Sequence, residues 1–387
     1  MRQCCVDALV ATSPVNITYF SDYACWLDPL FKEYMMSPGA SSSLAEAYAV
    51  LPLDGAPALV VNPNFLANAS DLWVTDLYTF GDAGMDLARN AQVFGSPSEA
   101  VAAVLKSRGL SEARIGLEMD GMPAARQTNL LEALPGALLL DCTNLIRLVR
   151  AVKSPEELRR LTQAAEISER AGMEALAMAR PGLPISEMIQ RYRERVATLG
   201  AALDHFAFSP RGFGIAVEPE YVLRADDTLY MDFGCIFRHY FSDTGTTLTM
   251  RDLPKDLKAR HDALRAAIEV GAEAMKPGLA ASVVQRAMWQ AFTSYGFQAC
   301  FPHGHGLGLE VRDYPIIVPG NGLRIRDDCV DVSSDLSMEE GMVNNLEAGM
   351  FLPGIGSLQI EKSFLVTATG SRELIPQAHH QPCVVSS

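Results

Sequence analysis

The chain has 387 residues, a formal net charge of −14 and 49% hydrophobic residues. This length predicts two domains, and the hydrophobic content is ordinary for a globular protein with enough material for a core. The negative charge, which no basic cluster offsets, argues against nucleic acid or an anionic membrane as a partner, and no apolar stretch has the length of a transmembrane helix. The eight cysteines show no CxxC spacing, so we expect reduced thiols in a cytoplasmic protein.

The first part of the chain alternates strand and helix patterns, which is typical of an α/β domain. Strands are predicted at 6–13, 17–23, 56–63, 114–120 and 137–143, and helices at 97–110 and 123–134. A longer helix begins after Ser154, because Pro155 and Glu157 follow as a first helical residue and an acid of the first turn. We place the boundary just before this helix, which gives domains at 1–149 and 150–387.

The second part contains a weak internal repeat. Residues 178–200 and 274–296 both run from a helix end through Pro-Gly-Leu into a second helix that ends at glycine. Two copies of a helix–helix–strand unit would pack their sheets together and leave the helices outside. Chance similarity of two helix-turn-helix segments is the alternative explanation.

Five acidic or imidazole side chains lie in segments of the second part that are otherwise apolar or glycine-rich. They are Asp232, Asp243, His305, Glu347 and Glu361. Carboxylates are costly to bury without a cation or partner, and four of them with one histidine form a ligand set for two divalent ions. Each acid lies within or beside a run of β-type residues, so we expect the five to converge on one face of a sheet. Taken singly, each could instead cap a helix or form an ion pair.

The order of these residues resembles that of the pita-bread metallopeptidases (family M24), which include methionine aminopeptidase, aminopeptidase P, prolidase and the metal-free creatinase. The resemblance is carried by Asp-x-Gly at 232–234, Ser-Asp at 242–243, Gly-His-Gly-x-Gly at 304–308, Glu-Ala-Gly at 347–349 and Gln-x-Glu at 359–361. The N-terminal part and the connector at 152–158 are similar to those of prolidase, aminopeptidase P and creatinase. The resemblance implies an N-terminal creatinase-like α/β domain, a C-terminal pita-bread α+β domain with an internal pseudo-twofold repeat, and a homodimer.

The resemblance also implies a role for each of the five residues. Asp232 would bind one metal ion, His305 and Glu347 the other, and Asp243 and Glu361 would bridge the two. Mn, Fe, Co and Zn all suit such a mixed carboxylate and histidine site. Glu347 would carry a proton from the attacking water to the leaving nitrogen, so Glu347 and His305 are the predicted catalytic residues.

Two further histidines, which peptidases of this family place around the scissile bond, are missing here. Ile215 stands at the first position and Arg312 at the second. Arg312 would offer a planar, charged fork to a substrate carboxylate, unless it pairs with Asp313 or with an acid in the 326–335 loop. His303 is a further candidate for substrate binding, whereas we expect His205 to be a structural or surface histidine.

These features predict a dinuclear metal-dependent hydrolase that cleaves an amide bond of a small, carboxylate-bearing substrate or dipeptide. Xaa-Pro dipeptidase is the nearest named activity. One competing function is a lyase of the dimethylsulfoniopropionate type, although that lyase carries an additional Asp where this chain has Gly234. A second is a C–N hydrolase similar to creatinase or ectoine hydrolase, and a third is a non-catalytic binding module.

Two segments are candidates for contact with the substrate. The polar segment 318–337 is either a loop that selects substrate through Arg324 or Arg326, or a solvated flap. In a dimer similar to that of creatinase, Trp26, Phe31 and Tyr34 would be candidates to cover the site of the partner subunit.

Overall fold

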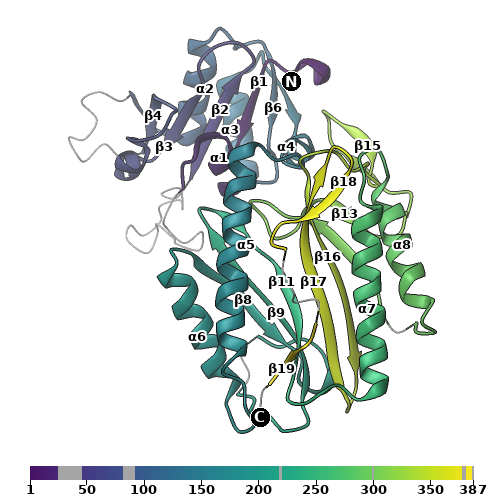
Figure 1. Ribbon diagram of the computed structural model, residues 1–387. Helices are drawn as coiled ribbons and strands as arrows, with labels where there is room; N and C mark the ends of the chain where they lie inside the picture. The colour runs from purple at the N-terminus through teal and green to yellow at the C-terminus, as the bar shows by residue number, and fades with distance from the viewer. Residues whose placement is uncertain (25–45, 82–91, 218–219, 299, 377–380, 386–387) are drawn as a thin grey trace. The chain divides into compact units, whose positions relative to one another are not determined.

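The computed structural model describes residues 1–24, 46–81, 92–217, 220–298, 300–376 and 381–385 (Figure 1). The chain forms two compact units, Met1–Arg147 with Ile325–Val332, and Leu148–Arg324 with Ser333–Ser387. The 325–332 segment was predicted within the second domain. It groups with the first unit instead, because Asp327 Oδ2 accepts hydrogen bonds from the backbone N–H groups of Asn144 and Leu145 at 2.7 and 3.0 Å.

The N-terminal unit is built on a seven-stranded sheet in the order β5-β4-β3-β2-β1-β6-β7, counted over the described residues. Its strands are β1 (Ala8–Ala11), β2 (Ala47–Pro52), β3 (Ala58–Val61), β4 (Asp76–Phe80), β5 (Gln92–Phe94), β6 (Arg114–Leu117) and β7 (Leu138–Asp141). Its helices are α1 (Pro14–Ser21), α2 (Pro97–Ser107), α3 (Ala124–Ala133) and α4 (Thr143–Val149), with 3-10 turns at Arg2–Cys4 and Pro63–Ala69.

The strand predicted at 17–23 is wrong, because α1 occupies most of this segment. Ser13 caps the helix by accepting a hydrogen bond from the backbone N–H of Asn16 at 3.3 Å, and Pro14 fills the first helical position. This local start signal outweighs the strand preference of the β-branched and aromatic residues that follow. The predicted dimer-contact residues Trp26, Phe31 and Tyr34 lie outside the described residues.

The C-terminal unit contains a ten-stranded sheet with the central order β10-β9-β11-β17-β16-β12-β13, where β8 pairs with β9, β18 with β17 and β19 with β11 among the strands described. Its helices are α5 (Pro155–Leu176), α6 (Ile185–Thr198), α7 (Lys255–Ala274) and α8 (Ala281–Thr293), with a 3-10 turn at Pro210–Gly212. The strands are β8 (Ala202–Phe208), β9 (Thr228–Phe237), β10 (Tyr240–Phe241), β11 (Thr244–Thr249), β12 (His303–Gly306), β13 (Asp313–Ile317), β16 (Val343–Leu352), β17 (Gly356–Thr367), β18 (Gly370–Glu373) and β19 (Cys383–Val384). The short strands β14 (Arg324–Arg326) and β15 (Asp331–Ser333) form a separate two-stranded sheet.

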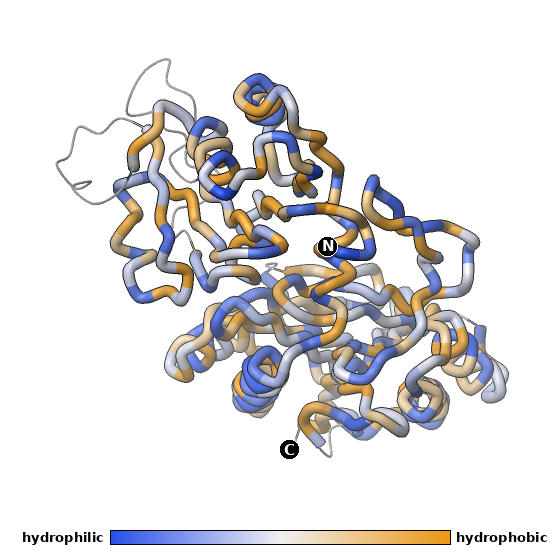
Figure 2. Tube along the Cα trace, turned by 90° about the horizontal axis from the view of Figure 1, so that it is seen from above, coloured by the Kyte–Doolittle hydropathy of each residue, from blue (hydrophilic) through white to orange (hydrophobic). Residues whose placement is uncertain are grey.

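The two halves of this unit follow the predicted repeat. Helices α5 and α6 lead into β8 and pack on β8, β9 and β11, while α7 and α8 lead into β12 and pack on β12, β13, β16 and β17. The start of α5 is the predicted one, with a capping box between Ser154 and Glu157. Along the tube of Figure 2 the helices alternate hydrophilic and hydrophobic residues, as expected for helices that cover one face of a sheet. No helix in the described part of the chain is long and apolar enough to cross a membrane.

The alternation of side chains along the central strands divides this sheet into two faces. On β9, Met231 and Phe233 belong to the core beneath α5 and α6, which leaves Asp232 on the opposite face. On β17, Ile360 belongs to the core beneath α7 and α8, which leaves Glu361 on the same opposite face as Asp232. The helices therefore cover one face, and the acidic residues gather on the other.

Candidate metal centre

Directly paired residues of five neighbouring strands form a row across this second face. His303 on β12 pairs with Glu347 on β16, which pairs with Glu361 on β17. Glu361 in turn pairs with Gly245 on β11, and Gly245 pairs with Asp232 on β9. Three of the predicted ligands thus lie in one row, although 129 residues separate the first from the last (361 − 232).

The other two predicted ligands, His305 and Asp243, lie beside this row. His305 is fully buried, and its Nδ1 hydrogen-bonds to the carbonyl oxygen of Gly306 at 3.0 Å, which leaves Nε2 as the deprotonated nitrogen. That Nε2 lies 3.5 Å from Asp243 Oδ2 and 3.9 Å from Glu347 Oε1, and it has no hydrogen-bond partner among the described residues. A buried lone pair that faces two carboxylates fits a site for a cation, because the bare imidazole nitrogen offers no proton to either acid.

Asp243 and Glu361 are the most deeply enclosed acids of the cluster. Burial raises the pKa of both carboxyls well above the usual range, and the charges of neighbouring acids, Asp232 for Asp243 and Asp243 for Glu361, raise it further. Glu361 accepts hydrogen bonds from Asn345 Nδ2 at 2.5 Å and from Gln359 Nε2. Ligand atoms of Asp243, His305 and Glu361 all lie within 4.8 Å of one another, so these three side chains can share one ion.

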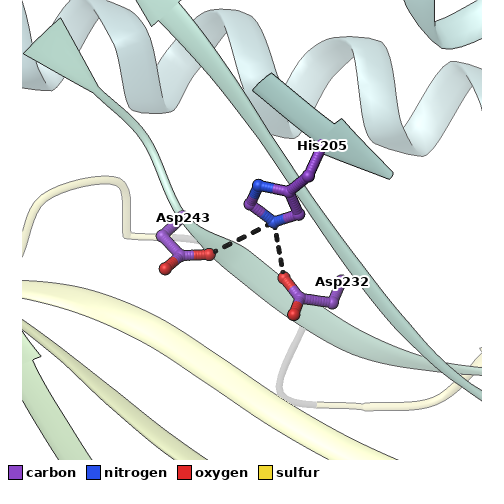
Figure 3. Close-up of side chains that lie close together, drawn as sticks. All are labelled: His205, Asp232 and Asp243. Atoms are coloured by element: carbon purple, nitrogen blue, oxygen red, sulfur yellow. Dashed lines mark hydrogen bonds and ion pairs between the residues drawn. The ribbon is translucent and has the colours of Figure 1, made fainter. Parts of the chain in front are cut away.

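His205, predicted to be a structural or surface histidine, lies within the acidic cluster. It lies on β8 with its Nε2 2.9 Å from Asp232 Oδ1 and 3.5 Å from Asp243 Oδ1 (Figure 3). Its Nδ1 lies 2.7 Å from Asp204 Oδ2. Ligand atoms of His205, Asp232 and Asp243 also lie within 4.8 Å of one another. Burial opposes the charged imidazole, but the hydrogen bonds to Asp204 and Asp232 outweigh it and raise the pKa of His205 to about 10.

A signal for His205 is present in the sequence. In the segment Leu203–Phe208, Phe206 and Phe208 alternate with His205 and Ala207, so a strand here turns the histidine away from the core. The pairing of this strand with β9, opposite Gly234, could not be inferred from that pattern.

Glu347 is held by two cationic groups at the edge of the cluster. His303 Nε2 lies 2.6 Å and Arg312 Nη2 3.1 Å from Glu347 Oε1. Burial disfavours the charged carboxylate, but the hydrogen bond from His303 and the charges of His303 and Arg312 prevail and lower the pKa of Glu347 to about 2. The predicted alternative partner of Arg312, Asp313, is instead paired with Arg150 at 3.1 Å.

A cavity of about 550 Å³ opens beside the cluster within the C-terminal unit. Its charged lining includes Asp232, His303, Arg312 and Glu347. The apolar lining includes Ile215, Tyr230, Phe301 and Phe351. Ile215 and Arg312, which the resemblance places at the positions of the two missing histidines, both line this cavity.

Arg324 and Arg326, the two arginines of the 318–337 segment, are exposed at the ends of β14. Neither belongs to the lining of the cavity.

Comparison with protein families assigns the chain. Residues 159–368 match the model of metallopeptidase family M24, and residues 1–152 match that of the creatinase/prolidase N-terminal domain. The chain belongs to metallopeptidase family M24. It is a metallohydrolase, and the family implies the use of divalent metal, as predicted from the acids and histidine of the second part.

Several peptidases and solved peptidase structures are similar to this chain. An uncharacterized peptidase of Bacillus subtilis, YqhT, is 25% identical over 72% of this chain and 77% of its own length, and an Xaa-Pro dipeptidase of Pyrococcus horikoshii is 27% identical over 60% of this chain and 64% of its own. An X-Pro aminopeptidase from Thermotoga maritima superposes with a TM-score of 0.76 at 17% identity, covering 98% of each chain. An Xaa-Pro dipeptidase from Bacillus anthracis superposes with a TM-score of 0.75 at 20% identity, covering 99% of this chain and 96% of its own. The predicted fold, a creatinase-like domain followed by a pita-bread domain, is confirmed.

Proposed function

We propose that this M24 protein is a dinuclear metal-dependent hydrolase that cleaves the amide bond of a small substrate with a free carboxylate. Xaa-Pro dipeptides are the nearest substrate class, since Xaa-Pro dipeptidases are among the relatives. The observation that carries the proposal is the buried, unprotonated Nε2 of His305, which faces the carboxylates of Asp243 and Glu347 without a hydrogen-bond partner among the described residues.

The five predicted ligands supply donors for two ions. Asp232 would bind one ion, His305 and Glu347 the second, and the deeply buried Asp243 and Glu361 would bridge them. A pair of divalent ions supplies a nucleophile at neutral pH and stabilises charge that develops on the carbonyl oxygen. The charge of the ions would also hold the buried carboxylates ionised in spite of their raised pKa. Mn, Fe, Co and Zn all suit this donor set.

Glu347 is the residue that we propose to move a proton. Its Oε1 lies at the cavity and accepts from both His303 and Arg312 at 2.6 and 3.1 Å, so the carboxylate is held in one orientation. A carboxylate fixed at this point can take a proton from an attacking water and deliver it to the leaving nitrogen.

Arg312 is the residue that we propose to bind the substrate carboxylate. Its side chain is 55% exposed while one nitrogen holds Glu347, so the remaining donors of the guanidinium are available toward the cavity. A planar guanidinium pairs with a carboxylate through two parallel hydrogen bonds. Ile215, Phe301 and Phe351 would contact the apolar part of the substrate, and a cavity of about 550 Å³ is in the range for a small ligand.

A lyase function is less favoured because of the surroundings of Gly234. A Cβ at this position would lie 2.4 Å from the carbonyl oxygen of Ser242 and 2.6 Å from Cε1 of His205. The backbone therefore leaves no room for the additional Asp that such a lyase carries between the first two ligands.

Hydrolysis of a dipeptide panel by the Mn²⁺-loaded protein tests the proposal. The panel contains Xaa-Pro and Xaa-Xaa dipeptides, and the matched control is Glu347→Gln, which keeps the shape of the side chain and removes its charge. We expect two bound metal ions in the wild type and cleavage that is lost in the variant. Fewer than two ions would contradict the dinuclear site, and two ions without cleavage of any dipeptide would contradict the substrate class.

A further inference from the structure

We propose that His205 is a sixth metal ligand, so that each of the two ions binds one imidazole. This inference rests on the proposed dinuclear centre and extends it. His205 would join Asp232 on the first ion, opposite His305 on the second, and the bridging Asp243 would lie between them.

The distances around Nε2 of His205 suit a shared ion. Donor atoms that each lie about 2.1 Å from one ion are about 3.0 Å apart in an octahedral and about 3.4 Å apart in a tetrahedral arrangement. Nε2 of His205 lies 2.9 Å from Asp232 Oδ1 and 3.5 Å from Asp243 Oδ1. The imidazole and the two carboxylates point at a common centre (Figure 3).

The other ring nitrogen supplies an independent observation. A histidine that binds a metal almost always donates its second N–H to a carboxylate or a carbonyl, which fixes the tautomer and the ring. Nδ1 of His205 lies 2.7 Å from Asp204 Oδ2. Nδ1 of His305 hydrogen-bonds in the same way to the carbonyl of Gly306 at 3.0 Å. Both imidazoles therefore turn Nε2 toward the acidic cluster.

The fold gives this imidazole a fixed place. His205 pairs directly with Gly234 across β8 and β9, and a Cβ on residue 234 would lie 2.6 Å from Cε1 and 3.0 Å from Nδ1 of the ring. The glycine therefore leaves the space that the imidazole fills. On the other face of β8, Phe206 and Phe208 are anchored in the core, which prevents the strand from turning over.

A role for His205 as a counter-ion alone is the competing explanation. A protonated imidazole between Asp204, Asp232 and Asp243 would neutralise part of their charge without touching a metal. The two roles differ in one measurable property, the effect of the bound ion on the Nδ1–H proton. Only in a ring whose Nε2 binds the ion is this proton coupled directly to the ion through the imidazole.

Cobalt(II) provides the readout that separates these roles. In the Co²⁺-loaded protein, the Nδ1–H of a coordinated imidazole gives a strongly shifted proton resonance that disappears in D₂O. We expect two such resonances in the wild type, from His205 and His305, and one in His205→Phe, which keeps a ring of similar size but has no donor. We also expect His205→Phe to bind one of the two Co²⁺ ions about tenfold or more weakly than the wild type.

The control is His239→Asn, which removes an exposed histidine from the turn between β9 and β10. It should retain both resonances and both ions. Circular dichroism of the metal-free variants checks that they fold. If His205→Phe does not fold, the number of shifted N–H resonances in the Co²⁺-loaded wild type still tests the inference.

The possible outcomes separate this inference from the proposed function. Two Co²⁺ ions in the wild type with a single shifted N–H resonance would overturn the role of His205 and leave the dinuclear site intact. Fewer than two ions would contradict the proposed function itself, and the ligand role for His205 would fall with it.

Discussion

Gly245 is the direct partner of Glu361 across β11 and β17, and a Cβ on residue 245 would lie only 2.7 Å from Glu361 Oε2. The same Cβ would lie 2.4 Å from Gln359 Nε2. Gly245 also pairs with Asp232 on its other side, so it occupies the centre of the row of acids. The absence of a side chain at this point keeps the space between Asp232 and Glu361 open.

We predict that Gly245→Ala impairs the metal site more than the fold. The atoms that the new methyl group would meet belong to the ends of the flexible side chains of Gln359 and Glu361, which can move aside, but Glu361 would then leave the position in which we propose that it bridges two ions. Metal affinity should fall by about tenfold or more. Metal titration and thermal unfolding check this, with Gly370→Ala as a control because a Cβ there meets nothing within 4 Å. Unchanged metal affinity would contradict the prediction.

Replacement of Arg312 should change the recognition of the substrate carboxylate. A hydrogen bond to a charged group contributes about 1.5–3 kcal/mol, so we expect Arg312→Lys to raise KM for dipeptides by about tenfold. Dipeptides whose C-terminus is amidated lack the carboxylate, and their KM should change little. Steady-state kinetics on both series is the measurement, with metal content determined in parallel because Arg312 also contacts Glu347 at 3.1 Å. An equal change for both series would assign Arg312 to the support of Glu347 alone.

The sequence predicted much of this arrangement because its strongest signals are local. Acids such as Asp232 and Glu361 stand out in runs of apolar β-type residues, and the capping box of Ser154 and Glu157 marks the start of α5. The alternation along each strand then puts the acids on one face. Such patterns depend only on neighbours in the chain, so they can be read without the fold.

The features that the sequence did not predict depend on pairing between distant segments. His205 reaches Asp232 only because β8 lies beside β9, and Arg312 reaches Glu347 because it follows β12, the neighbour of β16. No local pattern encodes either pairing. At 17–23 the pattern of β-type residues was misleading, because the Ser13 cap starts a helix there.

Gly172→Ala should destabilise the C-terminal unit although alanine is the better helix former. Gly172 lies within α5 where the helix meets β9, and a Cβ would lie 2.2 Å from the ring of Phe233. Alanine gains roughly 1 kcal/mol of helix propensity, while overpacking a core costs about 1–3 kcal/mol. Because the contact is so short and Phe233 is buried, we expect the cost to prevail. Urea unfolding of the metal-free protein measures the difference, and a stability equal to or above the wild type would contradict this account.

The stability of the metal-free protein should fall as the pH rises from neutral to alkaline values, partly because of His205. Burial alone would lower the pKa of this imidazole, but its hydrogen bonds to Asp204 and Asp232 raise it to about 10 in the folded state, against about 6.5 in an unfolded chain. The folded protein therefore binds this proton more tightly, so the stabilisation is complete below pH of about 6.5 and is lost as the pH rises through about 10.

Urea unfolding between pH 6.5 and 10, in excess chelator, tests this dependence on wild type and His205→Gln. Lysines, tyrosines and cysteines that titrate in the same range are common to both proteins, so their contributions cancel in the difference of the two unfolding free energies. That difference should shrink steadily with rising pH, because the variant has no imidazole to deprotonate. A constant difference across the range would mean that folding does not raise the pKa of His205 in the metal-free protein, and the interactions with Asp204 and Asp232 would then add no pH-dependent stability.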